Sequence, residues 1–232
     1  MPVRYAIYFA PPADSPLWQK ASQWIGRDSA KGMDIPVPET IGVPAERLWG
    51  MTVSPRRYGF HATLKAPMWL AEPYEYDDLV AAITRFCART APVSAGQLTP
   101  RMLGGFLALM PEVQSAELSD FAASCVAGFD ALRAPMSASE RAKRAQAGLS
   151  ERQTALLDQY GYPYVMDEFR LHMTLSDRLP EGEHDQMLAA ARAWFAPVLA
   201  EPVMITHLSV FSEAEPGAPF ARVADFPLLD SA

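Results

Sequence analysis

The chain is poor in cysteine and histidine. Its 232 residues include two cysteines and four histidines. Cys87 and Cys125 are far apart, whereas disulfide frameworks and zinc sites use closely spaced sets, so we expect both to fill the core in a reducing compartment. The sequence also lacks the His-Glu-x-x-His pattern of zinc hydrolases. We therefore predict no metal site and no cofactor.

Basic residues are fewer than acidic ones, with 20 Lys and Arg against 27 Asp and Glu. The formal net charge at pH 7 is −7 and the sequence pI is about 5.1. A protein that binds long nucleic acid without sequence preference needs a basic surface to neutralise phosphates, so we do not expect such a partner. A small, local positive pocket remains compatible with this balance.

Long apolar runs are absent as well. No window approaches the ~20 apolar residues that cross a membrane, and the start of the chain has no apolar signal region. We therefore expect a cytoplasmic protein that makes no contact with a membrane. The oligomeric state is left open by the sequence.

The chain contains one short sequence motif in two copies. Residues 60–64 read Phe-His-Ala-Thr-Leu, and residues 171–175 read Leu-His-Met-Thr-Leu. Because side chains alternate faces along a strand, His61 and Thr63 should share one face, as should His172 and Thr174. Apolar residues occupy the opposite face in both copies. Each copy is thus predicted to be a half-buried strand with an imidazole and a hydroxyl on its polar face.

The segments around the two motifs repeat in the same order: strand, helix, long loop, histidine strand, helix and strand. We expect one bilobal α+β domain over residues 1–232, with a first repeat at about 3–103 and a second at about 105–228. Two antiparallel-type sheets, flanked by helices and related by a pseudo-two-fold axis, should enclose a central cleft between the histidine strands. The roles of the long loops at 27–57 and 133–167 are not predicted.

Paired His-x-Thr-Leu motifs half a chain apart resemble those of the two-histidine (2H) phosphoesterase superfamily. The sequence of residues 57–67 and 169–175 most resembles that of a bacterial branch associated with phosphonate metabolism, a DUF1045-like family. The resemblance covers nearly the whole chain. It implies a bilobal fold with a V-shaped cleft and metal-independent phosphodiester chemistry.

Histidine suits that chemistry because its ordinary pKa near 6.5 lets it act as acid or base at neutral pH. One of His61 and His172 would activate water, and the other would protonate the departing oxygen. Which takes which role is left open. Thr63 and Thr174 can donate hydrogen bonds to the nonbridging phosphate oxygens.

Basic and aromatic residues near the motifs are candidates for substrate binding. Strand alternation places Lys65 on the His61 face and Arg170 on the His172 face. Arg57 is also an even number of residues from His61, so alternation would place it on the same face. Tyr58 precedes the first motif, and Tyr8 lies on a strand expected beside it. The candidate substrate-binding residues are Lys65, Arg57, Tyr58, Arg170 and Tyr8, and the tyrosines at 160, 162 and 164 could also stack a base or sugar.

Two functions from different classes remain at this point. The favoured one is a phosphodiesterase acting on a small cyclic phosphate or a 2′,3′-cyclic or 2′-5′ type phosphodiester, with a ribose cyclic phosphate from phosphonate catabolism as a natural candidate. The alternative is a binding module that captures a nucleotide or RNA end in the same cleft without turnover. In either case the expected partner is a small phosphate ester or nucleotide.

Overall fold

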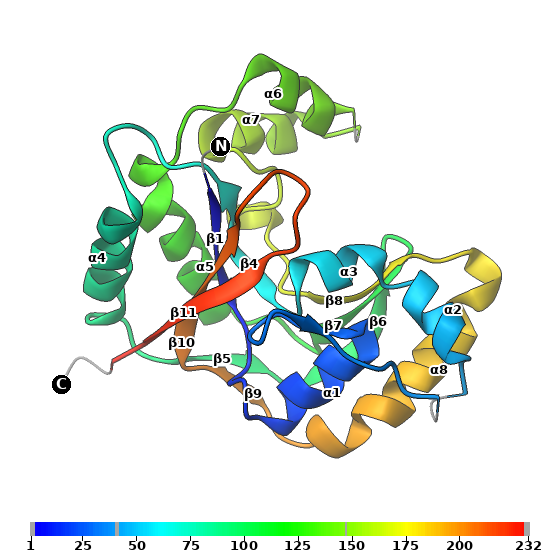
Figure 1. Ribbon diagram of the computed structural model, residues 1–232. Coiled ribbons are helices and arrows are strands. Elements are labelled where there is room, and N and C mark those ends of the chain that lie inside the picture. Colours follow the sequence, from blue (N-terminus) through cyan, green and yellow to red (C-terminus); the bar gives the residue numbers. More distant parts are fainter. Residues whose placement is uncertain (1–2, 40–41, 147, 230–232) are drawn as a thin grey trace.

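A single antiparallel sheet forms the centre of the computed structural model, which describes residues 3–39, 42–146 and 148–229 (Figure 1). Its seven strands are ordered β11-β10-β1-β4-β8-β7-β6. In that order the strands are Ala221–Pro227, His207–Glu213, Arg4–Phe9, Ala62–Met68, Met173–Arg178, Phe106–Pro111 and Leu98–Leu103. Two small two-stranded sheets join β2 (Arg27–Asp28) to β3 (Met33–Asp34) and β5 (Val93–Gly96) to β9 (Val203–Ile205).

The α+β class is confirmed, but the prediction of two separate sheets is wrong. The histidine strands β4 and β8 lie next to each other and are joined through one residue pair, Ala62 with Met173. That pair merges the two expected sheets into one. Sequence periodicity reports which face of a strand is apolar but not which strand is its neighbour, so it could not reveal this junction.

The strands of the two sequence repeats are interlocked. β1 pairs with β10 from the end of the chain, and β7 pairs with β6 from the first half. The turn at Gly104 and Gly105 joins β6 and β7 as a hairpin, whereas β1 pairs with β10 along the edge that β4 leaves open. Each half of the sheet therefore contains strands from both repeats, and no half is built by one repeat alone. The internal duplication itself stays a prediction.

Four amphipathic helices cover the sheet: α1 (Pro16–Ile25), α4 (Tyr76–Cys87), α5 (Ala116–Phe129) and α8 (His184–Phe195). Helices α4 and α5 pack on the half with β4, β10 and β11, whereas α1 and α8 pack on the half with β6, β7 and β8 (Figure 1). Ser15 caps α1 by accepting a hydrogen bond from the Trp18 N–H. Among the described residues, no helix has the length and apolarity to cross a bilayer.

The long loops contain short helices of their own. The first holds α2 (Ala45–Gly50) and α3 (Val53–Tyr58), and the second holds α6 (Ala138–Ala145) and α7 (Glu151–Tyr160). In Figure 1, α6 and α7 lie together at one end of the molecule, and α3 lies in front of the central strands. No side chain of α6 is fully buried. This helix is therefore held by its charged and aromatic contacts and not by a core.

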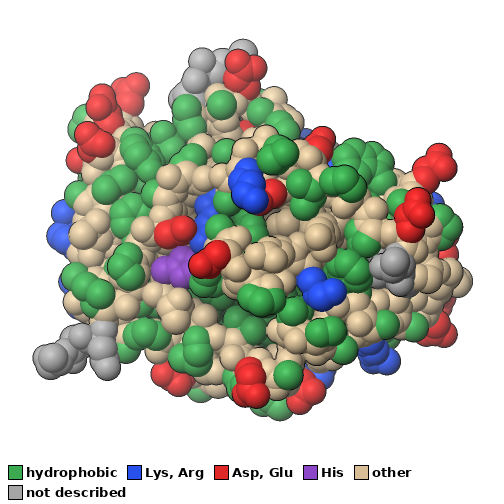
Figure 2. All heavy atoms as spheres, turned by 60° about the horizontal axis from the view of Figure 1, so that its bottom comes forward, with side chains coloured by type: hydrophobic (Ala, Val, Ile, Leu, Met, Phe, Trp, Pro, Cys, Tyr) green, Lys and Arg blue, Asp and Glu red, His purple; other side chains and the backbone are tan. Residues whose placement is uncertain are grey.

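Charge on the visible surface is mixed. On the face drawn in Figure 2, Lys and Arg side chains are scattered among acidic and apolar ones, and the described residues of that face form no basic patch. This agrees with the net charge of −7.

Candidate functional site

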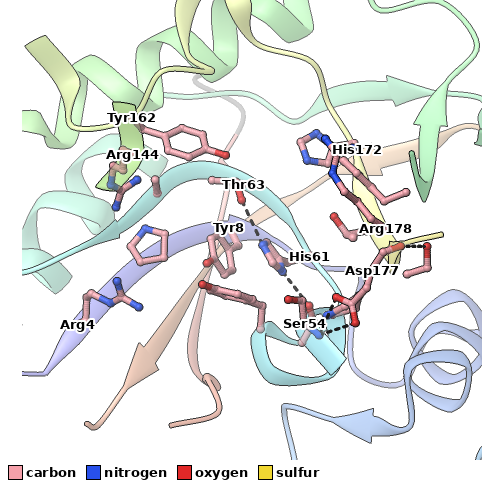
Figure 3. A pocket seen from close by; sticks show the side chains of 18 residues that line it. Arg4, Tyr8, Ser54, His61, Thr63, Arg144, Tyr162, His172, Asp177 and Arg178 are labelled. Carbon is pink, nitrogen blue, oxygen red and sulfur yellow. Dashed lines mark hydrogen bonds between the residues drawn. The ribbon is translucent and has the colours of Figure 1, made fainter. Parts of the chain in front are cut away.

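The two motifs face one cavity of about 380 Å³, which is lined by His61, Thr63, His172 and Thr174 (Figure 3). The motifs reach this cavity because β4 and β8 are neighbours at the centre of the sheet. Phe60 and Leu171, which precede the histidines, are buried in the core on the other side. The predicted alternation is thus realised in both strands next to the histidines.

Hydrogen bonds and stacking fix the His61 ring. Its Nδ1 lies 2.8 Å from the Gly59 carbonyl oxygen, and its Nε2 lies 3.2 Å from the Thr63 hydroxyl. A carbonyl only accepts, so Nδ1 carries the proton and the neutral ring accepts the Thr63 O–H at Nε2. The Tyr8 ring stacks on the imidazole with centroids 3.7 Å apart and planes inclined by 17°. The ring is therefore oriented before a substrate arrives.

His172 is held in the same way. Its Nδ1 lies 2.7 Å from the Arg170 carbonyl oxygen, again two residues upstream. The Nδ1–H must donate here too, which leaves Nε2 as the atom available for proton transfer. Both histidines thus have the same tautomer, fixed by the same local backbone contact.

Burial sets the charge state of the two rings. Desolvation, with a smaller contribution from the nearby His172, lowers the pKa of His61 to about 4 against the opposing effect of the Gly59 carbonyl. Desolvation also lowers the pKa of His172, opposed by the Arg170 carbonyl. Both imidazoles are therefore neutral at pH 7 in the free protein, and an arriving phosphate anion favours protonation of one of them.

The low pKa of His61 predicts a loss of stability in acid. The unfolded chain, with an ordinary histidine pKa near 6.5, binds a proton that folded His61 accepts only near pH 4. The stabilisation is complete above pH 6.5 and falls as the pH drops toward 4, by about 2–3 kcal/mol. Urea unfolding at pH 7 and pH 4.5 measures this loss. A His61→Gln variant should lose correspondingly less stability over that interval, and an equal loss in both proteins contradicts the assignment.

Comparison with known sequences places the chain in a family. Residues 63–221 match the family model described as "Protein of unknown function (DUF1045)". The chain belongs to the DUF1045 family. The matched range includes Thr63, His172 and Thr174 and begins two residues after His61.

Two curated relatives of this DUF1045 chain are named ribose 1,5-bisphosphate phosphokinase PhnN. One, from Janthinobacterium sp. (strain Marseille), is 40% identical over 97% of this chain and 50% of its own length. The other, from Laribacter hongkongensis (strain HLHK9), is 36% identical over 94% of this chain and 50% of its own length. The chain thus spans about half the length of these relatives.

Solved structures with a similar arrangement include E. coli LigT complexed with 3′-AMP, at 13% identity and a TM-score of 0.47 over 99% of this chain and 100% of the other. TT0787 of Thermus thermophilus gives 16% identity and a TM-score of 0.45 with the same coverage. A likeness of this size carries no argument about function. The function of this DUF1045 chain must be argued from its own residues.

Lys65 is a correction to the sequence prediction. It is 3% exposed, and its Nζ donates to the Val126 carbonyl at 3.1 Å and to Asp130 Oδ1 at 2.6 Å, on the helix side of the sheet. The cause is a β-bulge: Tyr8 pairs with Thr63, but Ile7 pairs with Lys65, so β4 has one extra residue. The extra residue reverses the alternation, and Lys65 faces the core with Ile7.

Arg57 and Arg170 do not line the cavity that the two histidines share. Arg57 forms an ion pair with buried Glu213 and donates to the Gly217 carbonyl at 3.1 Å, and it does not line the histidine cavity. Arg170 is exposed and lines a second cavity, which shares His172 with the first. Strand alternation did not apply to either residue, because Arg57 lies in helix α3 and Arg170 lies before β8 begins at Met173.

The two tyrosine candidates do line the histidine cavity. Tyr8 lies against His61 as described above, and the Tyr58 ring centroid is 6.4 Å from that of His61. Tyr58 also stacks on Phe220 at 5.1 Å. Their binding of substrate stays a prediction.

Three lining residues were not anticipated from sequence: Arg4, Arg144 and Arg178. Tyr162, named above as a candidate to stack a base or sugar, lines the cavity as well. Arg4 and Arg178 could have been found by extending the alternation along the strands. Arg4 is four residues before Tyr8 and Arg178 is six after His172, and residues an even number apart lie on the same face of a strand. Arg144 and Tyr162 come from the second long loop. No local pattern indicates where such a loop folds.

A metal site would need several His, Cys, Asp or Glu side chains close together. Within residues 3–39, 42–146 and 148–229 there is no group of three or more His, Cys, Asp or Glu side chains arranged to hold a metal ion. The prediction of a metal-free site stays a prediction. Chelation tests it directly.

Proposed function

We propose that this DUF1045 chain is a phosphodiesterase that hydrolyses a small cyclic phosphate by acid–base catalysis between His61 and His172, without a metal. The observation that carries the proposal is the matched tautomer of the two rings. Each has Nδ1–H engaged by a backbone carbonyl and lines the common cavity, where Nε2 of His61 accepts the Thr63 hydroxyl and Nε2 of His172 has no partner among the described residues. Two oriented, uncharged bases in one cavity suit proton transfer at neutral or mildly acidic pH.

In the proposed reaction one histidine takes a proton from water as the water oxygen forms a bond to phosphorus. The bond from phosphorus to one ester oxygen breaks, and the other histidine, protonated, gives its proton to that oxygen. The product is a phosphomonoester, and the protons balance after exchange with solvent. Thr174 would donate a hydrogen bond to a nonbridging oxygen, and Thr63 would do so when its hydroxyl turns from His61 Nε2 to the substrate. Arg178 lines the same cavity and adds a cation.

The names of the relatives suggest a substrate class but a different reaction. They describe a phosphokinase of ribose 1,5-bisphosphate, and this chain aligns with half of each relative. This sequence contains no Gly-x-x-x-x-Gly-Lys-Ser/Thr loop, the element with which many kinases hold nucleotide phosphates. We therefore favour hydrolysis over phosphate transfer, with a ribose cyclic phosphate as the first substrate to test.

A hydrolysis screen with the purified chain tests the proposal. It should include ribose cyclic phosphates, nucleoside 2′,3′-cyclic phosphates, 2′-5′ linked dinucleotides and RNA with a 2′,3′-cyclic end. Turnover of at least one of these is expected, and EDTA should not reduce it. Complete loss with EDTA would contradict metal independence. Tight nucleotide binding without any turnover would favour the binding module.

The pH profile of the active substrate gives a sharper expectation. One imidazole must be neutral and the other protonated, so the rate should be bell-shaped in pH. Because both pKa values lie below the ordinary 6.5, with His61 at about 4, the kcat/KM optimum should fall between pH 4 and 6.5. The optimum of kcat should lie higher, since the bound anion raises the histidine pKa values. An optimum of kcat/KM above pH 8 would show that other groups control the rate.

A further inference from the structure

The histidine cavity extends well beyond the two imidazoles. In Figure 3, Arg4, Arg144 and Tyr162 lie at one end, His172 and Arg178 lie at the other, and His61 lies between. A phosphodiester between the histidines would leave the Arg4 end free for another part of the substrate. The side chains at the Arg4 end should therefore indicate which chemical group of the substrate binds there.

Tyr8 supplies an uncommitted polar group there. Its side chain is 1% exposed, yet it lines the cavity. Its hydroxyl makes no hydrogen bond to a described residue, and it is not one of the solvent-inaccessible unpaired side-chain atoms, which are those of Ser22 and Ser29. It is not sealed in the core, so the cavity is the place from which a partner must come. A phenol hydroxyl donates readily to an anionic oxygen.

Arg144 supplies a positive charge. The other cations of α6 point elsewhere: Arg141 pairs with Asp158, and Lys143 is exposed. Arg144 is partly buried, lines the cavity and lies 5.9 Å from the Tyr162 ring. Within the described part of the chain no carboxylate forms an ion pair with it. Its charge is therefore available to a ligand.

Arg4 adds a second cation whose charge is only partly compensated. It pairs with Glu213 at 2.6 Å, but Glu213 also pairs with Arg57. One carboxylate thus faces two guanidinium groups. The acidic residue lining the cavity, Asp177, is at the opposite end, where it accepts hydrogen bonds from the Val53 and Ser54 N–H groups. The Arg4 end is positive overall.

We propose that this end, formed by Arg4, Arg144 and Tyr8, binds a phosphomonoester carried by the same molecule as the phosphodiester. The inference rests on the proposed function and specifies its substrate class: a small cyclic phosphodiester with a second phosphate. A phosphomonoester carries nearly two negative charges at pH 7 and accepts several hydrogen bonds, which suits two guanidinium groups and a phenol hydroxyl. A nucleobase would not require these charges.

Matched pairs of compounds test the proposal in the full chain. Kinetics compare adenosine 2′,3′-cyclic phosphate with the same compound bearing a 5′-phosphate. Calorimetry compares adenosine 3′-monophosphate with adenosine 3′,5′-bisphosphate, and inorganic phosphate serves as a third ligand. The wild type should prefer the compound with the extra phosphate by about 10- to 100-fold, the usual contribution of hydrogen bonds to a charged group.

Arg144→Gln should reduce that preference about tenfold or more, and Tyr8→Phe, which keeps the ring against His61, should reduce it to a smaller extent. Lys143→Gln on the same helix is the matched control and should leave the preference unchanged. Equal binding of both members by the wild type, or equal effects of Lys143→Gln and Arg144→Gln, overturns the proposal. So does inorganic phosphate that binds as tightly as the bisphosphate. Preferential binding without hydrolysis supports the subsite and contradicts only the phosphodiesterase.

Discussion

Replacement of His61 or His172 by alanine is expected to lower the turnover of the active substrate by about 10²- to 10⁴-fold, the range measured for positioned proton-transfer groups. Each ring is held at Nδ1 by a backbone carbonyl and presents Nε2 to the same cavity. Since both would serve one reaction step, the double variant should be much less impaired than the product of the two single effects. Single-turnover rates with saturating substrate measure these losses.

His184→Ala is the matched control. His184 contacts the Leu179 carbonyl at 3.2 Å and does not line the cavity, so its replacement should leave turnover unchanged. Circular dichroism and urea unfolding separate loss of catalysis from loss of fold. Full activity in a folded protein that lacks both cavity histidines would show that the chemistry lies elsewhere.

The motif strands show what the sequence can predict. Alternation of polar and apolar residues correctly placed His61, Thr63, His172 and Thr174 on one wall, because burial of one face fixes the facing of a strand. The same rule failed four residues after His61. The bulge before Lys65 arises in the pairing of β4 with β1, which lies more than fifty residues away in the chain. No local sequence pattern indicates it.

The sheet and the loops show what it cannot predict. Pairing of β1 with β10 joins segments from the two ends of the chain, and no local pattern indicates it. Arg144 lines the cavity because Arg141 pairs with Asp158 of α7 and because its own guanidinium lies near Tyr162. Such contacts between distant segments form the end of the cavity that we propose for the second phosphate. The sequence thus predicted the catalytic candidates better than the binding residues.

Gly59→Ala is expected to destabilise the fold by about 2–5 kcal/mol and to lower turnover as well. Gly59 has φ 78° and ψ 167°, a region that is open essentially to glycine alone and costs another residue about 1–3 kcal/mol. An added Cβ would also lie 2.7 Å from the Cβ of Ser29 and 3.2 Å from the Phe211 ring. Overpacking of this kind adds about 1–3 kcal/mol.

The effect on turnover follows from the Gly59 carbonyl. That oxygen accepts the Nδ1–H of His61, so a shift of the backbone at residue 59 rotates or releases the imidazole. Displacement of a catalytic group by about 1 Å can reduce the rate 10²-fold. Gly50→Ala, at the end of α2 and with open space around its Cβ, is the control and should change stability by less than about 0.5 kcal/mol. Urea unfolding and kcat of both variants test the link, and a Gly59→Ala protein with normal stability and turnover would show that this backbone contact does not position His61.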